Sequence, residues 1–227
     1  MTSAVQQVVN TPELLEKVLQ CLLDDVVPLS NQEDPRSLRT NANATSILNL
    51  LHCMEVCQAF NATILGSKAL RRASFLAPEA RTSRAWSHAP QSNQTQSPIL
   101  NPVIQTTFPA YHYRFWHLSV EVSGNRYCAY LIITRRDLEQ HRLHHRRRLG
   151  HGRSISKMLL SQPPILQLEA RIWEERDESK EYVGRTLALK EPIVECQGGL
   201  TIGMVHERAA EMFAEHRDVA AIKLTTV

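Results

Sequence analysis

The feature that most constrains the fold is the apolar spacing of residues 11–23, TPELLEKVLQCLL. Apolar residues recur there at i, i+1, i+4, i+5, i+8 and i+9, which places them on one broad stripe of an α-helix. Thr11 can cap that helix, Pro12 suits its first turn, and Glu13 favours the positive end of the helix dipole. The stripe consists of Leu14, Leu15, Val18, Leu19, Leu22 and Leu23. The spacing therefore predicts an amphipathic helix.

A second helical period runs through residues 45–65, with Thr45 or Ser46 as its cap. Gly66 can supply the left-handed residue that ends this helix, and Ser67 can cap a third helix that reaches Pro78. Short helices are marginal in water, so we expect them to pack together or against a partner. The apolar stripe of the second helix consists of Ile47, Leu50, Leu51, Met54 and Cys57.

The order of these helices resembles an F-box, and its wording is similar to that of F-box proteins of filamentous fungi. The residues that carry the resemblance are ELLEKVL (13–19), LLHCMEVCQAF (50–60) and GSKALRRASFL (66–76), about a third of the chain. Phe60 replaces the usual tryptophan, Asn49 replaces a common aspartate, and residues 25–45 are inserted. The inserted segment is polar, contains two prolines and follows neither period, which predicts an exposed loop.

The resemblance implies a partner and a binding surface. An F-box binds the Skp-type adaptor of a cullin–RING ubiquitin ligase, mainly through apolar side chains of its first helices. We expect Leu14, Leu15, Leu19, Leu50 and Leu51 to form an apolar surface that the folded chain leaves partly exposed. The full implied set is Pro12, Leu14, Leu15, Val18, Leu19, Ile47, Leu50, Leu51 and Met54.

From residue 111 onward the period changes from helical to extended. Two β-rich runs surround a Ser-Gly-Asn turn at 123–125, which predicts a hairpin. Residues 165–173 and 182–189 alternate as strands, and 154–160 are expected to form a short helix that prolines stop. Residues 199–216 predict a helix capped by Thr201, with Val205, Ala209, Met212 and Phe213 as its apolar stripe. Residues 219–227 predict a final strand.

Three segments also resemble elements of the fungal proteins, namely PILNPVI (98–104), SKMLLSQPP (156–164) and GLTIG (199–203).

These patterns predict an α+β fold with a largely antiparallel sheet. We expect a helical F-box-like domain at 8–78, a linker rich in Ser, Gln, Asn and Pro at 79–105, and an α+β domain at 106–227 that binds an unknown target. The start has no basic leader, no stretch reaches membrane-spanning length, and the five cysteines have no framework spacing. A cytoplasmic or nuclear protein that does not contact membranes is therefore expected.

Three patterns could carry chemistry. A run of His and Arg at 141–153 is open to interpretation as a solvated loop, a nuclear-import or phosphate-contacting segment, or a metal site, and the first is favoured because arginines repel a cation. The net charge of +3 and the lack of interleaved aromatic residues argue against a nucleic-acid partner. Cys53 and Cys57 lie one helical turn apart beside His52, but no second pair follows at zinc-finger spacing, which favours core packing.

No catalytic or phosphate-binding motif is present in the sequence, so we expect neither an enzyme nor a cofactor. The favoured function is an adaptor subunit of a Skp–cullin–RING ubiquitin ligase that recruits an unknown target. Two alternatives remain open, an F-box scaffold outside any ligase and a nuclear or nucleic-acid-binding protein that uses residues 141–153.

Overall fold

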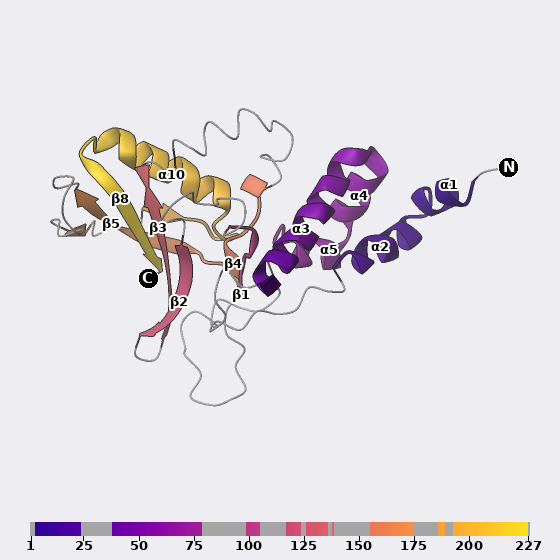
Figure 1. Ribbon diagram of the computed structural model, residues 1–227, viewed down its shortest axis with the longest axis horizontal. Helices are drawn as coiled ribbons and strands as arrows, with labels where there is room; N and C mark the ends of the chain where they lie inside the picture. Colours follow the sequence, from indigo (N-terminus) through magenta and orange to yellow (C-terminus); the bar gives the residue numbers. More distant parts are fainter. Residues whose placement is uncertain are drawn as a thin grey trace.

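The computed structural model of the chain places helices α1 to α5 at one end and an antiparallel sheet at the other (Figure 1). Of the helices, α1 (Ala4–Val9) lies farthest from the sheet. This arrangement confirms the predicted α+β class. The structure describes residues 3–23, 38–78, 99–104, 117–123, 126–135, 138, 155–174, 186–188 and 193–226, with the backbone alone at 38–42, 117–123, 126–127, 173–174 and 186–188.

The predicted first helix is present as α2 (Pro12–Cys21), with Pro12 in its first turn. Thr11 is the N-cap residue, but its hydroxyl donates to the Gln7 carbonyl (2.8 Å) and does not cap the helix. A short helix, α1 (Ala4–Val9), precedes it and is capped by the Ser3 side chain, which accepts a hydrogen bond from the Gln6 amide. The start of the helical end is therefore close to the prediction, with one additional turn of helix before it.

The inserted segment and the second helix differ from the prediction. Helix α3 begins at Leu38 and ends at Val56, so 38–45 are helical where a loop was expected. Asn43 and Ala44 are buried, which explains why this polar-looking stretch is ordered as helix. Thr45 and Ser46 lie inside α3 and cannot cap it. The chain breaks at Cys57, which is exposed and becomes the N-cap residue of α4 (Gln58–Gly66), so its predicted core position is wrong.

The third predicted helix is α5 (Lys68–Ala73), and Ser67 caps it by accepting a hydrogen bond from the Leu70 amide (3.1 Å). Gly66 is not in the left-handed region, so its predicted role as a terminator is wrong. The left-handed residue is Phe75, at φ 59° after α5. Its amide donates to the Arg72 carbonyl (3.0 Å) and the next amide, of Leu76, donates to the Arg71 carbonyl (2.8 Å). These two bonds form the Schellman motif that commonly ends a helix.

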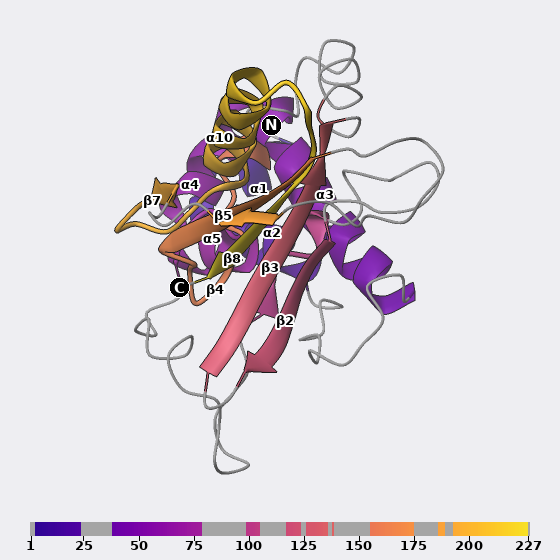
Figure 2. The same cartoon turned by 90° about the vertical axis from the view of Figure 1, so that its left-hand side faces the viewer.

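The larger sheet has the strand order β2-β3-β8-β5-β6 among the described residues, every neighbouring pair is antiparallel, and β7 also pairs with β5. The predicted hairpin is confirmed as β2 and β3, with Ser123 opposite Arg126. The predicted final strand is confirmed as β8, but it lies in the centre of the sheet between β3 and β5 (Figure 2). The bounds are β2 His117–Ser123, β3 Arg126–Thr134, β5 Gln167–Glu174, β6 Thr186–Ala188, β7 Val194–Glu195 and β8 Val219–Thr226.

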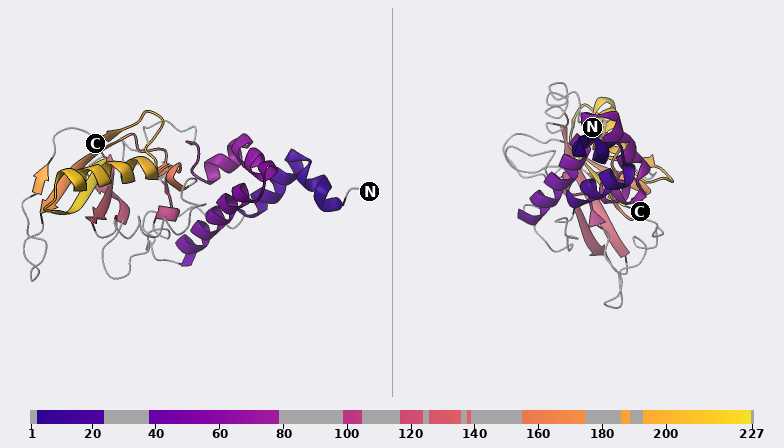
Figure 3. Two further views of the ribbon diagram at one scale, coloured as in Figure 1. Left: turned by 90° about the horizontal axis from the view of Figure 1, so that it is seen from above. Right: turned by 90° about the vertical axis from the view of Figure 1, so that its right-hand side faces the viewer.

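Helix α10 (Ile202–Glu215) packs along one face of this sheet, as the view from above shows (Figure 3). The Thr201 side chain caps it by accepting from the Met204 amide (3.3 Å), as predicted. Buried residues alternate with less buried ones along β3, β5 and the second half of β8, so that one side of each strand is buried against the helix. The four predicted stripe residues of α10 are all buried in the same cluster, Val205, Ala209, Met212 and Phe213.

The predicted linker is wrong at its carboxy-terminal end. Ile99 and Leu100 form β1, which pairs with β4 (Ser161–Gln162) in a separate two-stranded sheet, and Val103 and Ile104 are fully buried. β4 directly follows residues 154–160, which were expected to be helical. Only Ile155 and Ser156 of that region are helical among the described residues, and Leu159 forms a β-bridge with Thr201. Residues 79–98 lie outside the described residues.

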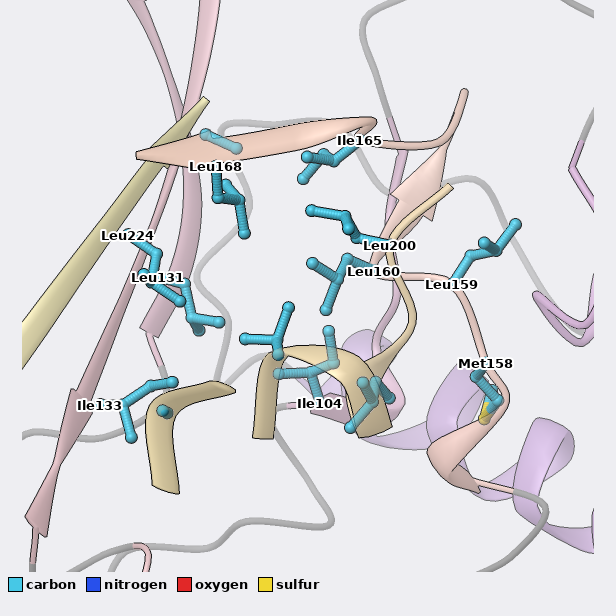
Figure 4. Packing of buried hydrophobic residues seen from close by; sticks show 14 of the residues in the cluster. Ile104, Leu131, Ile133, Met158, Leu159, Leu160, Ile165, Leu168, Leu200 and Leu224 are labelled. Carbon is cyan, nitrogen blue, oxygen red and sulfur yellow. The ribbon is translucent and has the colours of Figure 1, made fainter. Parts of the chain in front are cut away.

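One hydrophobic core joins the two ends of the molecule. Residues of α3, together with Phe75, belong to the same buried cluster as the sheet, α10 and the segment around 158–160. Figure 4 shows the part of this cluster in which Leu160 and Leu200 lie near the sheet residue Leu168. A backbone bond crosses the same junction, from the Leu159 amide to the Phe75 carbonyl (2.7 Å). On the sheet side, the Leu160 amide donates to the Leu200 carbonyl (3.1 Å) and the Asn101 amide donates to the Leu160 carbonyl (2.9 Å). The segments 66–76, 99–104, 156–164 and 199–203 therefore meet in one buried seam. The predicted division into separate domains stays a prediction.

Candidate partner-binding surface

Helix α2 has two apolar faces, and only one of them is buried. Leu15 and Leu19 are almost fully covered, and they pack in a small cluster with residues from α3, α4 and α5. Burying such a side chain is worth roughly 1.5–3 kcal/mol, so this face fixes α2 on the helical end. The members of the cluster are Leu15, Leu19, Leu50, Ile64 and Leu70.

The other apolar face of α2 points away from this cluster. Leu14, Val18 and Leu22 are 45%, 52% and 37% exposed, and their i, i+4, i+8 spacing places them in one line along the helix. We refer to these three residues as the α2 stripe. Pro12 is also exposed, at the start of the same helix. A row of exposed apolar side chains on a helix is the feature expected of a surface that another protein covers.

The predicted binding set is therefore split by the structure. Leu15, Leu19, Leu50, Ile47 and Leu51 are buried, so the prediction that leucines from both helices share one exposed surface is wrong. The physical reason is the pairing of apolar residues along α2. A stripe this broad faces two directions, and its own bundle takes one of them. Pro12, Leu14 and Val18 stay accessible, whereas Met54 is half-buried against both clusters.

The structure adds Leu22, which was outside the predicted set. Its position eight residues after Leu14 was the signal in the sequence that could have identified it. Other large apolar residues are exposed on different helices, among them Val5 on α1, Val56 at the end of α3 and Leu65 on α4. Single exposed apolar residues are common on protein surfaces and carry no function by themselves.

A polar contact holds α2 in this orientation. The Ser67 hydroxyl donates to the Glu16 carboxylate (Ser67 Oγ to Glu16 Oε1, 2.5 Å). The Ser67 Oγ atom also accepts a hydrogen bond from the Leu70 amide. The Gln20 side chain donates to the same carboxylate oxygen from one turn further along α2 (3.4 Å). Ser67 is buried and Glu16 is half-buried, so water competes little for this contact. The α2 stripe is therefore presented by a helix whose other side is fixed by packing and by hydrogen bonds.

The cysteine pair has no metal-binding geometry. Cys53 is half-buried, and burial raises the pKa of its thiol above the ordinary value, which disfavours the thiolate that a metal ion needs. Cys57 lies beyond the break that ends α3. Within the described residues, no three His, Cys, Asp or Glu side chains are placed to hold a metal ion. The basic run at 141–153 lies outside the described residues.

Comparisons with protein-family models, with curated proteins and with solved structures each found no match. In the described part of the chain, no helix has the length and apolar character needed to cross a membrane.

Proposed function

We propose that this chain is an F-box subunit of a Skp–cullin–RING ubiquitin ligase, and that the α2 stripe binds the Skp-type adaptor. The observation that carries the proposal is the exposure of Leu14, Val18 and Leu22 in one line, on a helix whose adjoining face is buried. The resemblance of 13–19, 50–60 and 66–76 to an F-box supplies the class of partner. The proposed surface is narrower than the one expected from the sequence, because it excludes the buried leucines of α2 and α3.

The exposed fractions set the scale of the expected binding energy. A fully buried Leu or Val contributes roughly 1.5–3 kcal/mol, and the α2 stripe residues are already about half covered. Each one therefore gains roughly 1 kcal/mol when a partner covers it, which corresponds to about fivefold in affinity. Loss of all three residues would therefore weaken binding strongly. The rest of the binding energy must come from contacts elsewhere on the helical end.

In this proposal the sheet end recruits the target, and the chain performs no chemistry of its own. The ligase would place it in the cytoplasm, the nucleus or both. The buried seam between the two ends gives this arrangement a physical basis. A target bound to the sheet and an adaptor bound to α2 would be held at a fixed separation, because one core joins both surfaces.

Affinity purification of the full chain from the cells that produce it tests this proposal. Recovery of the adaptor together with a cullin is the expected result. Recovery of the adaptor without a cullin would replace the ligase with a scaffold that binds the adaptor alone. Recovery of nucleic acid without either protein would overturn the proposal and support the nucleic-acid-binding alternative.

A further inference from the structure

The six-stranded sheet has a second face, opposite α10, whose side chains differ in kind from those of the core. Along β3, β5 and residues 222–225 of β8 the buried residues alternate with half-buried or exposed ones, which places the latter together on the far side of the sheet. Ala221 lies on the same side and is buried, so this side is accessible only beyond it, from Lys223 onward. We call this side the open face. Figure 2 shows α10 on one side of these strands. The open face contains Tyr130, Ile132, Glu169, Arg171, Lys223 and Thr225.

Two cations lie directly opposite each other on this face. Arg171 of β5 and Lys223 of β8 are register partners, so their side chains leave the sheet side by side. Like charges placed opposite each other on neighbouring strands destabilise a sheet. Arg171 is exposed, and neither cation forms an ion pair with a carboxylate among the described residues. Within the part of the chain that the structure describes, two positive charges therefore lie side by side on neighbouring central strands.

Tyr130 holds one of the two cations in place. The Lys223 ammonium lies over the Tyr130 ring, with Nζ 4.5 Å from the ring centroid. This cation–π contact stabilises the charge without neutralising it, so the ammonium can still donate hydrogen bonds to an anion. The Arg171 guanidinium beside it offers a planar set of N–H donors that fits a carboxylate. Together the two side chains form a small site for negative charge, in which Tyr130 positions the ammonium.

The same residues distinguish between classes of anionic partner. A single-stranded nucleic acid needs free aromatic faces on which bases stack, and the Lys223 ammonium already covers a face of Tyr130. Glu169 lies on the same face, two residues from Arg171, and would repel a continuous phosphate backbone. A protein segment with separate acidic side chains can place its carboxylates on the two cations and avoid Glu169.

We propose that the open face binds an acidic segment of a protein partner, with Arg171 and Lys223 contacting its carboxylates and Tyr130 positioning Lys223. The proposed function is needed only to identify this protein partner as the target that the ligase recruits. The contact itself does not need the adaptor. Charge complementarity at one site on a flat surface predicts weak, salt-dependent binding.

Fluorescence anisotropy of the purified full chain, with a labelled glutamate-rich peptide at low salt, tests this inference. We expect the Arg171→Gln/Lys223→Gln variant to bind about tenfold more weakly than wild type, since two exposed ion pairs are lost. Its melting temperature should change little, because relief of the repulsion between the two cations offsets the lost contact between Lys223 and Tyr130. Lys157→Gln/Arg217→Gln removes two exposed charges elsewhere and should leave the affinity unchanged. A glutamine-for-glutamate peptide should not bind.

Several results would overturn the inference. Equal weakening in the Lys157→Gln/Arg217→Gln control would mean that only net charge matters. Binding of a single-stranded oligonucleotide that is tighter than the peptide, and that is lost in Arg171→Gln/Lys223→Gln, would assign the face to nucleic acid. The Leu14→Asp/Val18→Asp variant should bind the peptide as wild type does, so failure of the adaptor proposal and failure of this inference are distinguishable.

Discussion

The Leu159 amide donates a 2.7 Å hydrogen bond to the carbonyl of Phe75, a residue whose own backbone is left-handed. The bond links the end of α5 to the segment that leads into the sheet. The Phe75 side chain is buried in the core that both ends share. An aromatic residue at positive φ is uncommon, because its Cβ crowds the following carbonyl at a cost of roughly 1–2 kcal/mol. Burial of the ring offsets that cost.

This geometry predicts an unusual order of stability for two Phe75 variants. Phe75→Ala should cost about 3–5 kcal/mol, as for other buried aromatic residues. Phe75→Gly should be no worse, because relief of the left-handed strain (roughly 1–2 kcal/mol) exceeds the loss of one methyl group (about 0.8 kcal/mol). Phe213 in α10 is the matched control, since Gly there should be about 1 kcal/mol worse than Ala. Urea unfolding measures all four, and an alanine variant of Phe75 clearly more stable than the glycine variant contradicts the account.

Two glycines should respond to alanine in opposite directions. At Gly199 (φ 99°) an added Cβ would lie 2.5 Å from Pro164 Cβ and 2.8 Å from Leu159 Cδ2, so Gly199→Ala should destabilise the chain by about 2–4 kcal/mol. At Gly66 nothing lies within 4 Å of the added Cβ, and the residue ends a helix. Gly66→Ala should therefore stabilise by up to about 1 kcal/mol. Melting curves of the two variants and of wild type measure both changes. A Gly199→Ala variant that melts at a higher temperature than Gly66→Ala would contradict this prediction.

Arg135 should be difficult to replace, even by lysine. Its guanidinium donates to the carbonyls of His216 (2.8 Å), Arg217 (2.9 Å) and Val219 (3.2 Å), and it stacks 5.0 Å from the Phe213 ring centroid. Arg135→Lys keeps the charge at the end of α10 but cannot reach all three carbonyls, so we expect a loss of about 1–3 kcal/mol.

The control for Arg135 is Arg217→Gln, which removes an exposed charge beside the same helix end and should cost less than about 0.5 kcal/mol. Equal stability of Arg135→Lys and wild type in urea unfolding would show that the charge alone matters there.

The cysteines should differ in their reaction with iodoacetamide. Cys21 and Cys57 are exposed, whereas burial covers Cys53 and raises the pKa of its thiol. Thiolate is the reactive form, so Cys53 should be modified more slowly than the other two near neutral pH, and its rate should rise as the pH increases toward its pKa. Peptide mapping by mass spectrometry after timed labelling measures each rate. Modification of Cys53 at the rate of Cys57 would mean that the helical end opens readily.

The elements that could be predicted from the sequence are those whose local signals agree with their tertiary contacts. The stripe and the Thr201 cap of α10 both point to one helix packed on one sheet face. Cys57 illustrates the opposite case, since it lies on a helical period but its backbone is extended and separates α3 from α4. The left-handed Phe75 could not be predicted either. Local conformational preference predicts the left-handed backbone at Gly66. The left-handed backbone at Phe75 is favourable only because the Phe75 ring is buried.

The exposed surface of α2 also depends on tertiary contacts that the sequence pattern does not give. The spacing of α2 indicates a broad apolar stripe, but spacing cannot show which edge of that stripe the bundle covers. Leu14 and Leu15 are neighbours with similar preferences, yet one is 45% exposed and the other is buried. The difference comes from the position of α4 and α5, which are far along the chain. The paired cations of the open face also depend on strand register, which pairs Arg171 with Lys223 across many residues of sequence.

The most direct test of the central claim is the dissociation constant between the purified full chain and a Skp-type adaptor, measured by isothermal titration calorimetry. The Leu14→Asp/Val18→Asp variant should bind about tenfold to a hundredfold more weakly than wild type, with an unchanged circular dichroism spectrum. Val56→Asp/Leu65→Asp places the same two charges on exposed apolar sites of α3 and α4 and should bind like wild type. A folded Leu14→Asp/Val18→Asp variant with wild-type affinity would contradict the assignment of the α2 stripe, and a wild-type chain that does not bind the adaptor would contradict the proposed function itself.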